Sequence, residues 1–453
     1  MKTIAKFSLA PILAGVFFIA SSLLAQNPKV ISNKLHDEIR SRATQEYASL
    51  EQLYKHLHAN PELSFHEEKT AARIAEELEQ AGFSVARNIG GHGVVGVLKN
   101  GNGPTVLVRT DLDALPVTEN TGVEYASRVR VHDDQSNEVG VMHACGHDIH
   151  MTSFIGTARL LSQLKDKWRG TLVFIGQPAE ERGGGARKML ADGLFTKFPK
   201  PDYGVAWHVA SELPAGTAGF CEGYALANVN SVDVTIRGVG GHGAYPHTTK
   251  DPIVMAAETI MALQTIVSRE MKPIDPAVVT VGSIHGGTKH NIIPDEVHLQ
   301  LTVRSYSDHA KEKTLQAIER ICKGLAIAGG VPENRMPIVK VQDEFTPSTY
   351  NDPALVKRMT ASMQAILGVD KVVTKEPVMG GEDFGEYGRT PEKIPLAILW
   401  LGAIAPERVQ ESLRTGRSLP SLHSSQFAPL PEPAIKTGVT AMTAAVLDLL
   451  NGK

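Results

Sequence analysis

Eight consecutive residues, from His143 to His150, concentrate side chains that bind metal ions. They include three histidines, one cysteine and one aspartate, which are common ligands of Zn²⁺ and related divalent ions. Cys145 and His147 are two residues apart, so in an extended chain they point to the same side. Gly146 between them lets the backbone pass close to an ion. Taken alone, the run also suits a loop with a buried thiol and solvated histidines.

Three predicted strands end in side chains that could complete such a site. The strands cover 105–110, 171–177 and 202–207. Because open α/β sheets bind ligands beside the carboxyl ends of their strands, we expect these side chains to meet at one edge. With the cysteine and histidine run, they indicate a metallohydrolase. The residues that follow the strands, with one histidine near the end of the chain, are Asp111, Asp113, Glu180, Glu181, His208 and His423.

The remaining elements follow from hydrophobic periodicity. Helical spacing predicts helices, and short apolar runs bounded by turn residues predict strands. The predicted helices cover 36–59, 66–81, 148–165, 352–367 and 431–450, and further strands cover 83–89, 93–99, 371–375 and 395–401.

The pattern changes between residue 228 and about residue 336. It reads strand, helix, strand, strand, helix, strand, which is the β-α-β-β-α-β order of a ferredoxin-like unit. We therefore expect an α/β protein whose catalytic domain has a mixed sheet flanked by helices. That domain would comprise 30–227 and 337–453, with the ferredoxin-like domain inserted at 228–336. A length of 453 residues agrees with two or three domains.

Composition narrows the class of protein. A formal net charge of -3 gives no reason to expect nucleic acid or an anionic membrane as a partner. The chain has three cysteines: Cys145, Cys221 and Cys322. Such a small and odd number does not indicate a fold held together by disulfide bonds.

The N-terminus has the parts of a secretory signal peptide. Lys2 and Lys6 precede an uncharged stretch from Phe7 to Ala25, and Ala25 is a small residue at a plausible cleavage point. We expect residues 1–25 to direct export to a bacterial periplasm. The stretch is also long enough to remain as an uncleaved anchor.

The segment Gly91–Gly96 matches the letters of a dinucleotide-binding fingerprint, but that motif must open a helix. Here β-branched residues lead into the turn-forming run 99–103, which predicts a strand followed by a hairpin turn. We therefore do not expect nucleotide binding.

Seven short motifs occur in order: Asp111–Pro116, His143–Asp148, Gln177–Glu181, Gly240–Ala244, Asn291–Pro294, Gly380–Phe384 and Leu422–His423. In these motifs the chain resembles peptidase family M20, in the aminoacylase and carboxypeptidase clan of di-metal hydrolases. It is most similar to the branch of hippurate hydrolase and the plant auxin-conjugate amidohydrolases, which the Cys-Gly-His element marks. The resemblance covers roughly residues 36 to 450.

The resemblance implies a site for two divalent ions in each subunit. Zn²⁺ or Mn²⁺ would occupy it, with Co²⁺ or Ni²⁺ as further candidates, and a thiolate ligand favours zinc over magnesium. The implied ligands are Cys145, His147, Glu181, His208 and His423.

The resemblance also implies roles for the other carboxylates. Glu180 would be the general base, taking a proton from water and returning it to the leaving amine. Asp113 would accept a hydrogen bond from a ligand imidazole and so fix its tautomer. Asp111 lies beside the site without a defined role. Without the other ligands, Glu180 and Glu181 would suit a solvated pair at a strand end.

Three residues of the inserted domain would act on the substrate. The resemblance assigns His242 to oxyanion stabilisation, across a homodimer formed through this domain, and Asn291 and Arg304 to substrate contacts. Arg304 also suits a solvated charge at a strand end.

Two loops are expected at the rim of the site. The segment 381–383 would form a rim near His423, with the role of Glu382 left open. The loop between Tyr125 and His143 is longer than the family pattern and would alter the rim.

The expected function is that of an exported, metal-dependent amidohydrolase that cleaves N-acyl amino acids, hippurate-like compounds or small peptides. A dedicated dipeptidase or carboxypeptidase is the alternative on the same site. A non-catalytic metal or peptide binder is a third reading, but such a protein would not need Glu180 beside a metal ligand.

Overall fold

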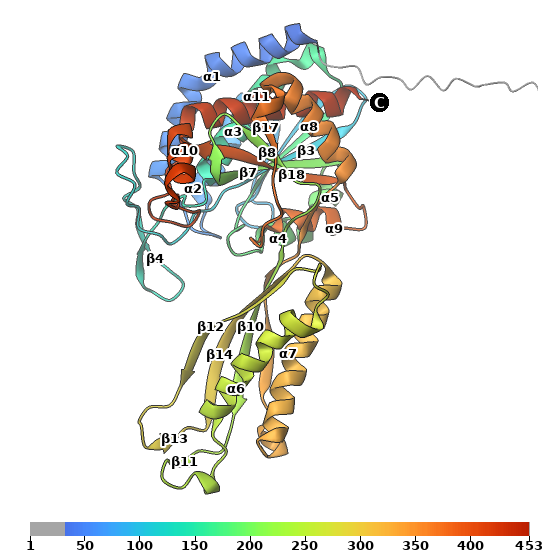
Figure 1. The fold of residues 1–453 in the computed structure, drawn as a ribbon. Coiled ribbons are helices and arrows are strands. Elements are labelled where there is room, and N and C mark those ends of the chain that lie inside the picture. Colours follow the sequence, from blue (N-terminus) through green and yellow to red (C-terminus); the bar gives the residue numbers. More distant parts are fainter. Residues whose placement is uncertain (1–31, 453) are drawn as a thin grey trace, which may run out of the picture.

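The computed structural model describes residues 32–452, which form two units (Figure 1). A large α/β unit holds both ends of the described chain, and a smaller elongated unit projects from it. The predicted signal peptide, residues 1–25, lies outside the described residues.

The large unit is built on an eight-stranded sheet with the order β1-β2-β6-β3-β7-β18-β8-β17. Its centre is parallel, and β2 runs antiparallel to β6. The predicted α/β class with a mixed sheet flanked by helices is therefore confirmed. The strands are β1 (Ser84–Ala86), β2 (Val94–Asn100), β3 (Thr105–Asp111), β6 (Gly170–Gln177), β7 (Tyr203–Pro214), β8 (Ala218–Phe220), β17 (Val372–Thr374) and β18 (Leu396–Ile404).

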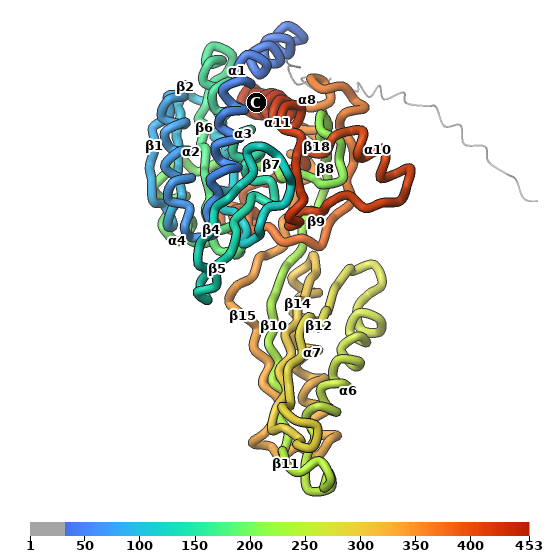
Figure 2. Tube along the Cα trace, turned by 90° about the vertical axis from the view of Figure 1, so that its left-hand side faces the viewer, coloured from blue at the N-terminus to red at the C-terminus, as the bar shows by residue number. Residues whose placement is uncertain are grey.

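Helices cover both faces of this sheet (Figure 2). One face packs against α1 (Asn33–Ala59), α2 (Glu68–Gln80), α3 (His147–Gln163), α8 (Pro353–Leu367), α10 (Pro406–Thr415) and α11 (Pro431–Asn451). The other packs against the short helices α4 (Gly185–Ala191), α5 (Leu194–Lys197) and α9 (Glu386–Arg389).

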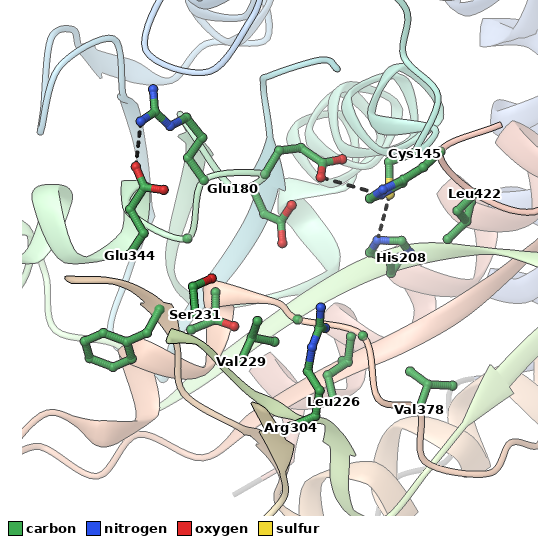
Figure 3. Close-up of a pocket in the computed structure, with 18 of the residues that line it drawn as sticks. Cys145, Glu180, His208, Leu226, Val229, Ser231, Arg304, Glu344, Val378 and Leu422 are labelled. Atoms are coloured by element: carbon green, nitrogen blue, oxygen red, sulfur yellow. Dashed lines mark hydrogen bonds and ion pairs between the residues drawn. The ribbon is translucent and has the colours of Figure 1, made fainter. Parts of the chain in front are cut away.

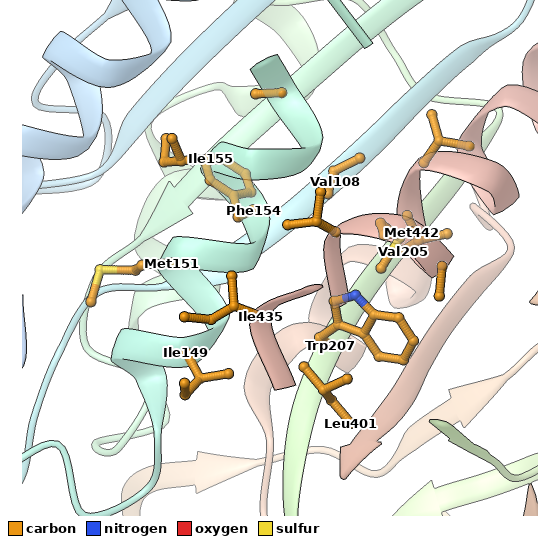
Figure 4. Close-up of a cluster of buried hydrophobic side chains, with 14 of the residues drawn as sticks. Val108, Ile149, Met151, Phe154, Ile155, Val205, Trp207, Leu401, Ile435 and Met442 are labelled. Atoms are coloured by element: carbon orange, nitrogen blue, oxygen red, sulfur yellow. The ribbon is translucent and has the colours of Figure 1, made fainter. Parts of the chain in front are cut away.

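The core of the first face lies between α3, α11 and the central strands (Figure 4). Phe154 of α3 and Met442 of α11 are almost fully buried in the same cluster as Val108 of β3. The indole of Trp207 donates to the carbonyl of Gly438, 3.1 Å away, which ties β7 to α11. Length and composition would let α11 span a membrane, but 83% of its most apolar window is buried, as in a core helix.

The ladder between β3 and β7 ends early and leaves room for a site. It pairs Val106 with Tyr203 and stops at Arg109 and Ala206. Beyond that point Asp111 and His208 are no longer joined by backbone hydrogen bonds, so their side chains can converge. His208 lies within β7 and not at its end, since β7 continues beside β18 to Pro214.

The smaller unit has its own antiparallel sheet, with the order β12-β14-β10-β15. Alternate residues of β10, such as Val232 and Val234, point to one face, where two helices bury them. The elements are β10 (Asn228–Arg237), β11 (Gly241–His242), α6 (Pro252–Thr265), β12 (Ala277–Gly286), β13 (Ile292–Ile293), β14 (Glu296–Ser305), α7 (Asp308–Ala328) and β15 (Ile338–Thr346).

Two sequence predictions need correction here. The boundary at 336 is too early, because β15 pairs with β10 and belongs to the smaller sheet. β15 is mostly exposed, so it lacks the apolar pattern that marks a core strand. The hairpin expected around 99–103 does not form, because β6 lies between β2 and β3. Three two-stranded pairs complete the described sheets: β4 (Arg130–His132) with β5 (Glu138–Gly140), β9 (Gly223–Leu226) with β16 (Thr349–Asn351), and β11 with β13.

Candidate active site

Five predicted metal ligands meet at the carboxyl edge of the large sheet, although they come from four separate segments. Sγ of Cys145 lies 3.6 Å from Nε2 of His208 (Figure 3). Nε2 of His147 lies 3.7 Å from one oxygen of Glu181, and Nε2 of His423 lies 3.5 Å from the other. Glu181 therefore points its two oxygens at two different imidazoles, an arrangement suited to a carboxylate shared by two ions.

The imidazoles are oriented by backbone carbonyls. Nδ1 of His147 donates to the carbonyl of Asp113, and Nδ1 of His208 donates to the carbonyl of Val209, each at 2.8 Å. Each ring therefore presents the lone pair of Nε2 to the site, as a metal ligand requires.

Gly146 gives the backbone between Cys145 and His147 the conformation that brings both side chains to the site. It has φ of +77° and forms the N-cap of α3, and a Cβ there would lie 2.6 Å from Cγ2 of Val209. Its conformation and the lack of space both favour glycine. His423 is held to the same run, because its N–H donates to the carbonyl of Ala144 at 2.9 Å.

The charges of the site fit a bound cation. Burial, together with the charge of Glu181, raises the pKa of the Cys145 thiol well above its usual value, so a thiolate here needs a cation beside it. Burial acts to lower the pKa of His147, but Asp111 and Asp113 outweigh it and raise that pKa to about 10. These carboxylates therefore favour positive charge at the ring, and a metal ion at Nε2 would supply that charge in place of a proton. Nε2 of His147 and Oε1 of Glu181 are buried and have no hydrogen-bond partner among the described residues.

Glu180 lies between the ligands and a buried charge cluster. It lines the cleft beside Glu181, and its Oε2 is 3.9 Å from Nε2 of His147. Burial, followed by the charge of Glu382, raises the pKa of Glu180 well above its usual value. It is therefore placed to take and release a proton next to the ligand atoms.

Asp113 and Asp111 lie beside the metal-ligand residues and accept hydrogen bonds from them or from their neighbours. Oδ2 of Asp113 accepts the N–H of Glu181 at 3.0 Å, while its Oδ1 is 3.5 Å from Nδ1 of His147. The closer contact to His147 is thus the backbone carbonyl of Asp113 and not its carboxylate. Asp111 accepts from Arg109 at 2.9 Å and from Nδ1 of His150 at 2.8 Å, so both its oxygens are engaged.

His150 is not available as a metal ligand, because both of its ring nitrogens already have hydrogen-bond partners. Its Nδ1 contacts Asp111, and its Nε2 accepts the N–H of Val209 at 2.8 Å. The remaining histidine of the run is His143. It is buried, and neither of its ring nitrogens has a hydrogen-bond partner in the described structure.

The predicted rim at 381–383 is wrong for two of its three residues. Glu382 and Asp383 are fully buried, and only Gly381 lines the cleft. The two carboxylates contact the buried guanidinium of Arg109 at 2.8 and 3.4 Å. A buried arginine needs such partners, and this pairing draws the segment inward.

A cleft of about 370 Å³ lies between the ligands and the smaller unit. Leu226, Val378 and Trp400 give it an apolar wall. Arg304 of β14 enters from the smaller unit and donates to the carbonyl of Met379 at 3.0 Å (Figure 3). A cation thus faces the ligand cluster across the cleft.

Two of the predicted substrate residues are not at this cleft. His242 on β11 and Asn291 just before β13 are exposed, at the end of the smaller unit farthest from the large sheet (Figure 1). Nδ1 of His242 accepts the N–H of Ala244 at 3.0 Å, so a neutral ring carries its proton on Nε2. The side chain is therefore prepared to donate a hydrogen bond outward.

Sequence reasoning missed several residues that support the site. Arg109 had a usable signal, because a cation directly follows the apolar run 106–108 within a strand that is buried along most of its length. Glu67 and His58 had none, since their partners Ala179 and Asp148 lie 112 and 90 residues away along the chain.

Comparisons with known proteins agree with this geometry. Residues 107–414 match the model of peptidase family M20/M25/M40. The chain is 34% identical to thermostable carboxypeptidase 2 of Saccharolobus solfataricus, over 88% of this chain and 95% of that protein. It is 37% identical to hippurate hydrolase of Campylobacter jejuni, over 74% of this chain and 84% of that protein.

A solved structure extends the similarity to the whole fold. The crystal structure of the YXEP protein of Bacillus subtilis, described as a dinuclear metal binding peptidase, superposes with a TM-score of 0.73 and 30% identity. The match covers 91% of this chain and 100% of that chain.

Proposed function

Because the chain belongs to peptidase family M20/M25/M40, whose members are metal-dependent amidohydrolases and peptidases, we propose that it cleaves the amide bond of N-acyl amino acids or small peptides. The observation that carries the proposal is the arrangement of Glu180 beside Glu181 and His147, whose ligand atoms are buried and unpaired in the described structure. A binding protein would have no use for a buried base at this position.

The ligand set suits two divalent ions. Cys145, His147, Glu181, His208 and His423 would hold them, and the thiolate and imidazoles favour Zn²⁺, with Mn²⁺ as the other main candidate. Bound there, the ions would supply Lewis-acid polarisation of the amide carbonyl and of the attacking water.

The chain itself would supply proton transfer and substrate orientation. Glu180 takes a proton from the attacking water and delivers it to the amide nitrogen as the C–N bond breaks. Arg304 faces the cleft with a guanidinium, which suits the carboxylate of an amino acid product. The apolar wall formed by Leu226, Val378 and Trp400 would receive the acyl group.

A homodimer would complete the site. His242 is exposed and far from the cleft of its own chain, yet the contact from Ala244 fits it to be a hydrogen-bond donor. We propose that His242 of the partner subunit reaches the cleft, together with Asn291 of the partner subunit, and stabilises the oxyanion.

Export to a periplasm, suggested by residues 1–25, is part of the same proposal.

A hydrolysis panel tests this function. Purified protein is assayed with N-acetyl amino acids, N-benzoyl amino acids, dipeptides and longer peptides, each with and without added Zn²⁺, Mn²⁺ or Co²⁺. Metal-stimulated release of free amino acid from the N-acyl compounds supports the proposal. Preference for peptides with a free N-terminus would favour the dipeptidase or carboxypeptidase alternative, and no hydrolysis in any arm would contradict both.

A further inference from the structure

Besides the ligand His423, two residues near the ligand cluster have a backbone conformation that side chains rarely adopt. Phe65 has φ of +68° and Ala179 has φ of +48°. Ala179 is fully buried and directly precedes Glu180. A non-glycine residue keeps a left-handed conformation only where its surroundings hold it there. The direction in which the following two glutamates leave the backbone depends on it.

One carboxylate oxygen contacts both strained residues. Oε1 of Glu67 accepts the N–H of Ala179 at 2.7 Å and the N–H of Phe65 at 2.8 Å. Glu67 is fully buried and stands at the N-cap of α2, but its side chain does not cap that helix. It turns instead into the gap between the α1–α2 connection and the loop that follows β6.

The amide on the other side of Glu180 is held in the same way. Oδ2 of Asp113 accepts the N–H of Glu181 at 3.0 Å and the hydroxyl of Ser64 at 2.6 Å. The α1–α2 connection therefore reaches both sides of Glu180, directly through Glu67 and by way of Ser64 through Asp113.

In the loop that follows β6, the carbonyl groups of Ala179 and Glu180 accept hydrogen bonds from N–H groups of the same loop. The N–H of Gly183 donates to the carbonyl of Glu180 at 2.7 Å, and the N–H of Gly184 donates to the carbonyl of Ala179 at 3.2 Å. The loop is thus a tight turn whose internal bonds leave the N–H of Ala179 for an outside acceptor, and Glu67 provides it.

We propose that Glu67 is a positioning residue that holds Ala179 in its left-handed conformation and so aims Glu180 and Glu181 at the cleft. The inference rests on the proposed function, in which those two glutamates are the base and a metal ligand. Glu67 contacts no ligand itself and acts through the backbone of Ala179.

The role requires an acceptor and not a charge. Oε2 of Glu67 is buried without a partner in the described structure. Burial, with the nearby charge of Asp113, raises the pKa of Glu67 to about 7. A glutamine, whose amide oxygen can accept the same two N–H groups, should therefore substitute for the carboxylate.

The first test compares Glu67→Gln with Glu67→Leu. We expect Glu67→Gln to keep kcat within about threefold of the natural chain. Glu67→Leu should lower kcat by roughly 10- to 100-fold at little changed KM, the scale of a small misplacement of a catalytic group. Glu62→Leu is the matched control, because Glu62 lies in the same connection and accepts the N–H of Thr70 but does not contact Ala179. Equal losses of kcat in all three variants would overturn the proposal.

The second test needs no substrate and no metal. Ala179→Gly removes the penalty of the left-handed conformation, since glycine adopts it freely. Denaturant midpoints are measured for Glu67→Leu, for Ala179→Gly and for the double variant. We expect Glu67→Leu to lower the midpoint less in the Ala179→Gly background than in the natural one, whereas Glu62→Leu should lower it equally in both.

The two tests separate the positioning role from the proposed function. Equal effects of Glu67→Leu in both backgrounds would overturn the role of Glu67, whatever the enzyme hydrolyses. Should Glu67→Leu fail to fold, the same comparison is made with Glu67→Gln, which must then show near-natural midpoints in both backgrounds. Coupling between the two positions in a chain that cleaves none of the panel substrates would support the positioning role and contradict the proposed function.

Discussion

Nε2 of His147 lies 3.7 Å from Oε1 of Glu181, and neither buried atom has a hydrogen-bond partner in the described part of the chain. Unpaired polar atoms of this kind are costly to bury. Both residues carry atoms that coordinate divalent ions, and Cys145 and His208 lie beside them. A cation between these atoms would satisfy all of them, so the unpaired atoms mark where the site needs metal.

Metal removal should therefore affect both activity and stability. Exhaustive chelation is expected to abolish hydrolysis and to lower the melting temperature, because ions that bind only the folded chain stabilise it. Cys145→Ser should weaken metal binding, since a hydroxyl is a poorer ligand for a borderline-soft ion than a thiolate. Elemental analysis and calorimetry check both, and full activity in metal-free protein would refute the metal assignment.

His242 gives a test of the proposed dimer. His242→Ala should lower kcat by about 10²-fold or more, the usual effect of removing one oxyanion donor, with unchanged metal content. Mixed dimers of His242→Ala and Glu180→Gln chains should regain part of the activity, because one of their two sites has both groups. If proven mixed dimers stay inactive, His242 does not act across subunits.

His58 predicts how stability changes with pH. Its Nδ1 lies 2.6 Å from Asp148 and its Nε2 lies 3.0 Å from Glu119, with all three side chains buried. Burial acts to lower the pKa of His58, but the two carboxylates outweigh it and raise that pKa to about 10. Because the folded-state pKa exceeds the unfolded value of about 6.5, the stabilisation is fully present below pH 6.5. It is lost as the pH rises toward 10, and a shift of this size is worth on the order of 5 kcal/mol.

The comparison for His58 uses a neutral variant. The difference in unfolding free energy between the natural chain and His58→Gln should be largest near pH 6 and should shrink steadily up to pH 10. A difference that stays constant over this range would mean that folding does not raise the pKa of His58.

Arg109 should be important for stability. Arg109→Met leaves Asp111, Glu382 and Asp383 buried without their cation, and breaking a buried ionic network typically costs about 3–5 kcal/mol. Arg42→Met, which removes a partly exposed pair with Glu38, should cost no more than about 1 kcal/mol. Denaturant titration compares the two, and similar losses would show that the buried network contributes little.

The sequence predicted the parts of the site that depend on strand ends. Parallel strands bring their carboxyl ends to one edge, so residues after β3 and β6 could be expected to meet. His208 was placed correctly at that edge although its strand runs on, because the ladder with β3 ends just before it. Short apolar runs bounded by turn residues likewise predicted the central strands of the large sheet.

Other features depend on contacts that spacing does not encode. Nothing in the sequence marks Ala179 as left-handed, since alanine carries no signal for positive φ. The burial of Glu382 follows from Arg109, which is distant in sequence. The hairpin expected after β2 failed because β6, from much later in the chain, inserts beside it. Turn residues predict a change of direction, but they do not determine which strand becomes the neighbour.

The most direct test of the central claim is the effect of Glu180→Gln on kcat, measured with bound metal. Glutamine keeps the shape of the side chain but cannot take a proton from water. The account predicts that kcat for an N-acyl amino acid falls by roughly 10²–10⁴-fold, with metal content per chain unchanged. Undiminished kcat would contradict the assignment of Glu180 as the base, and loss of metal would show that it is a ligand instead.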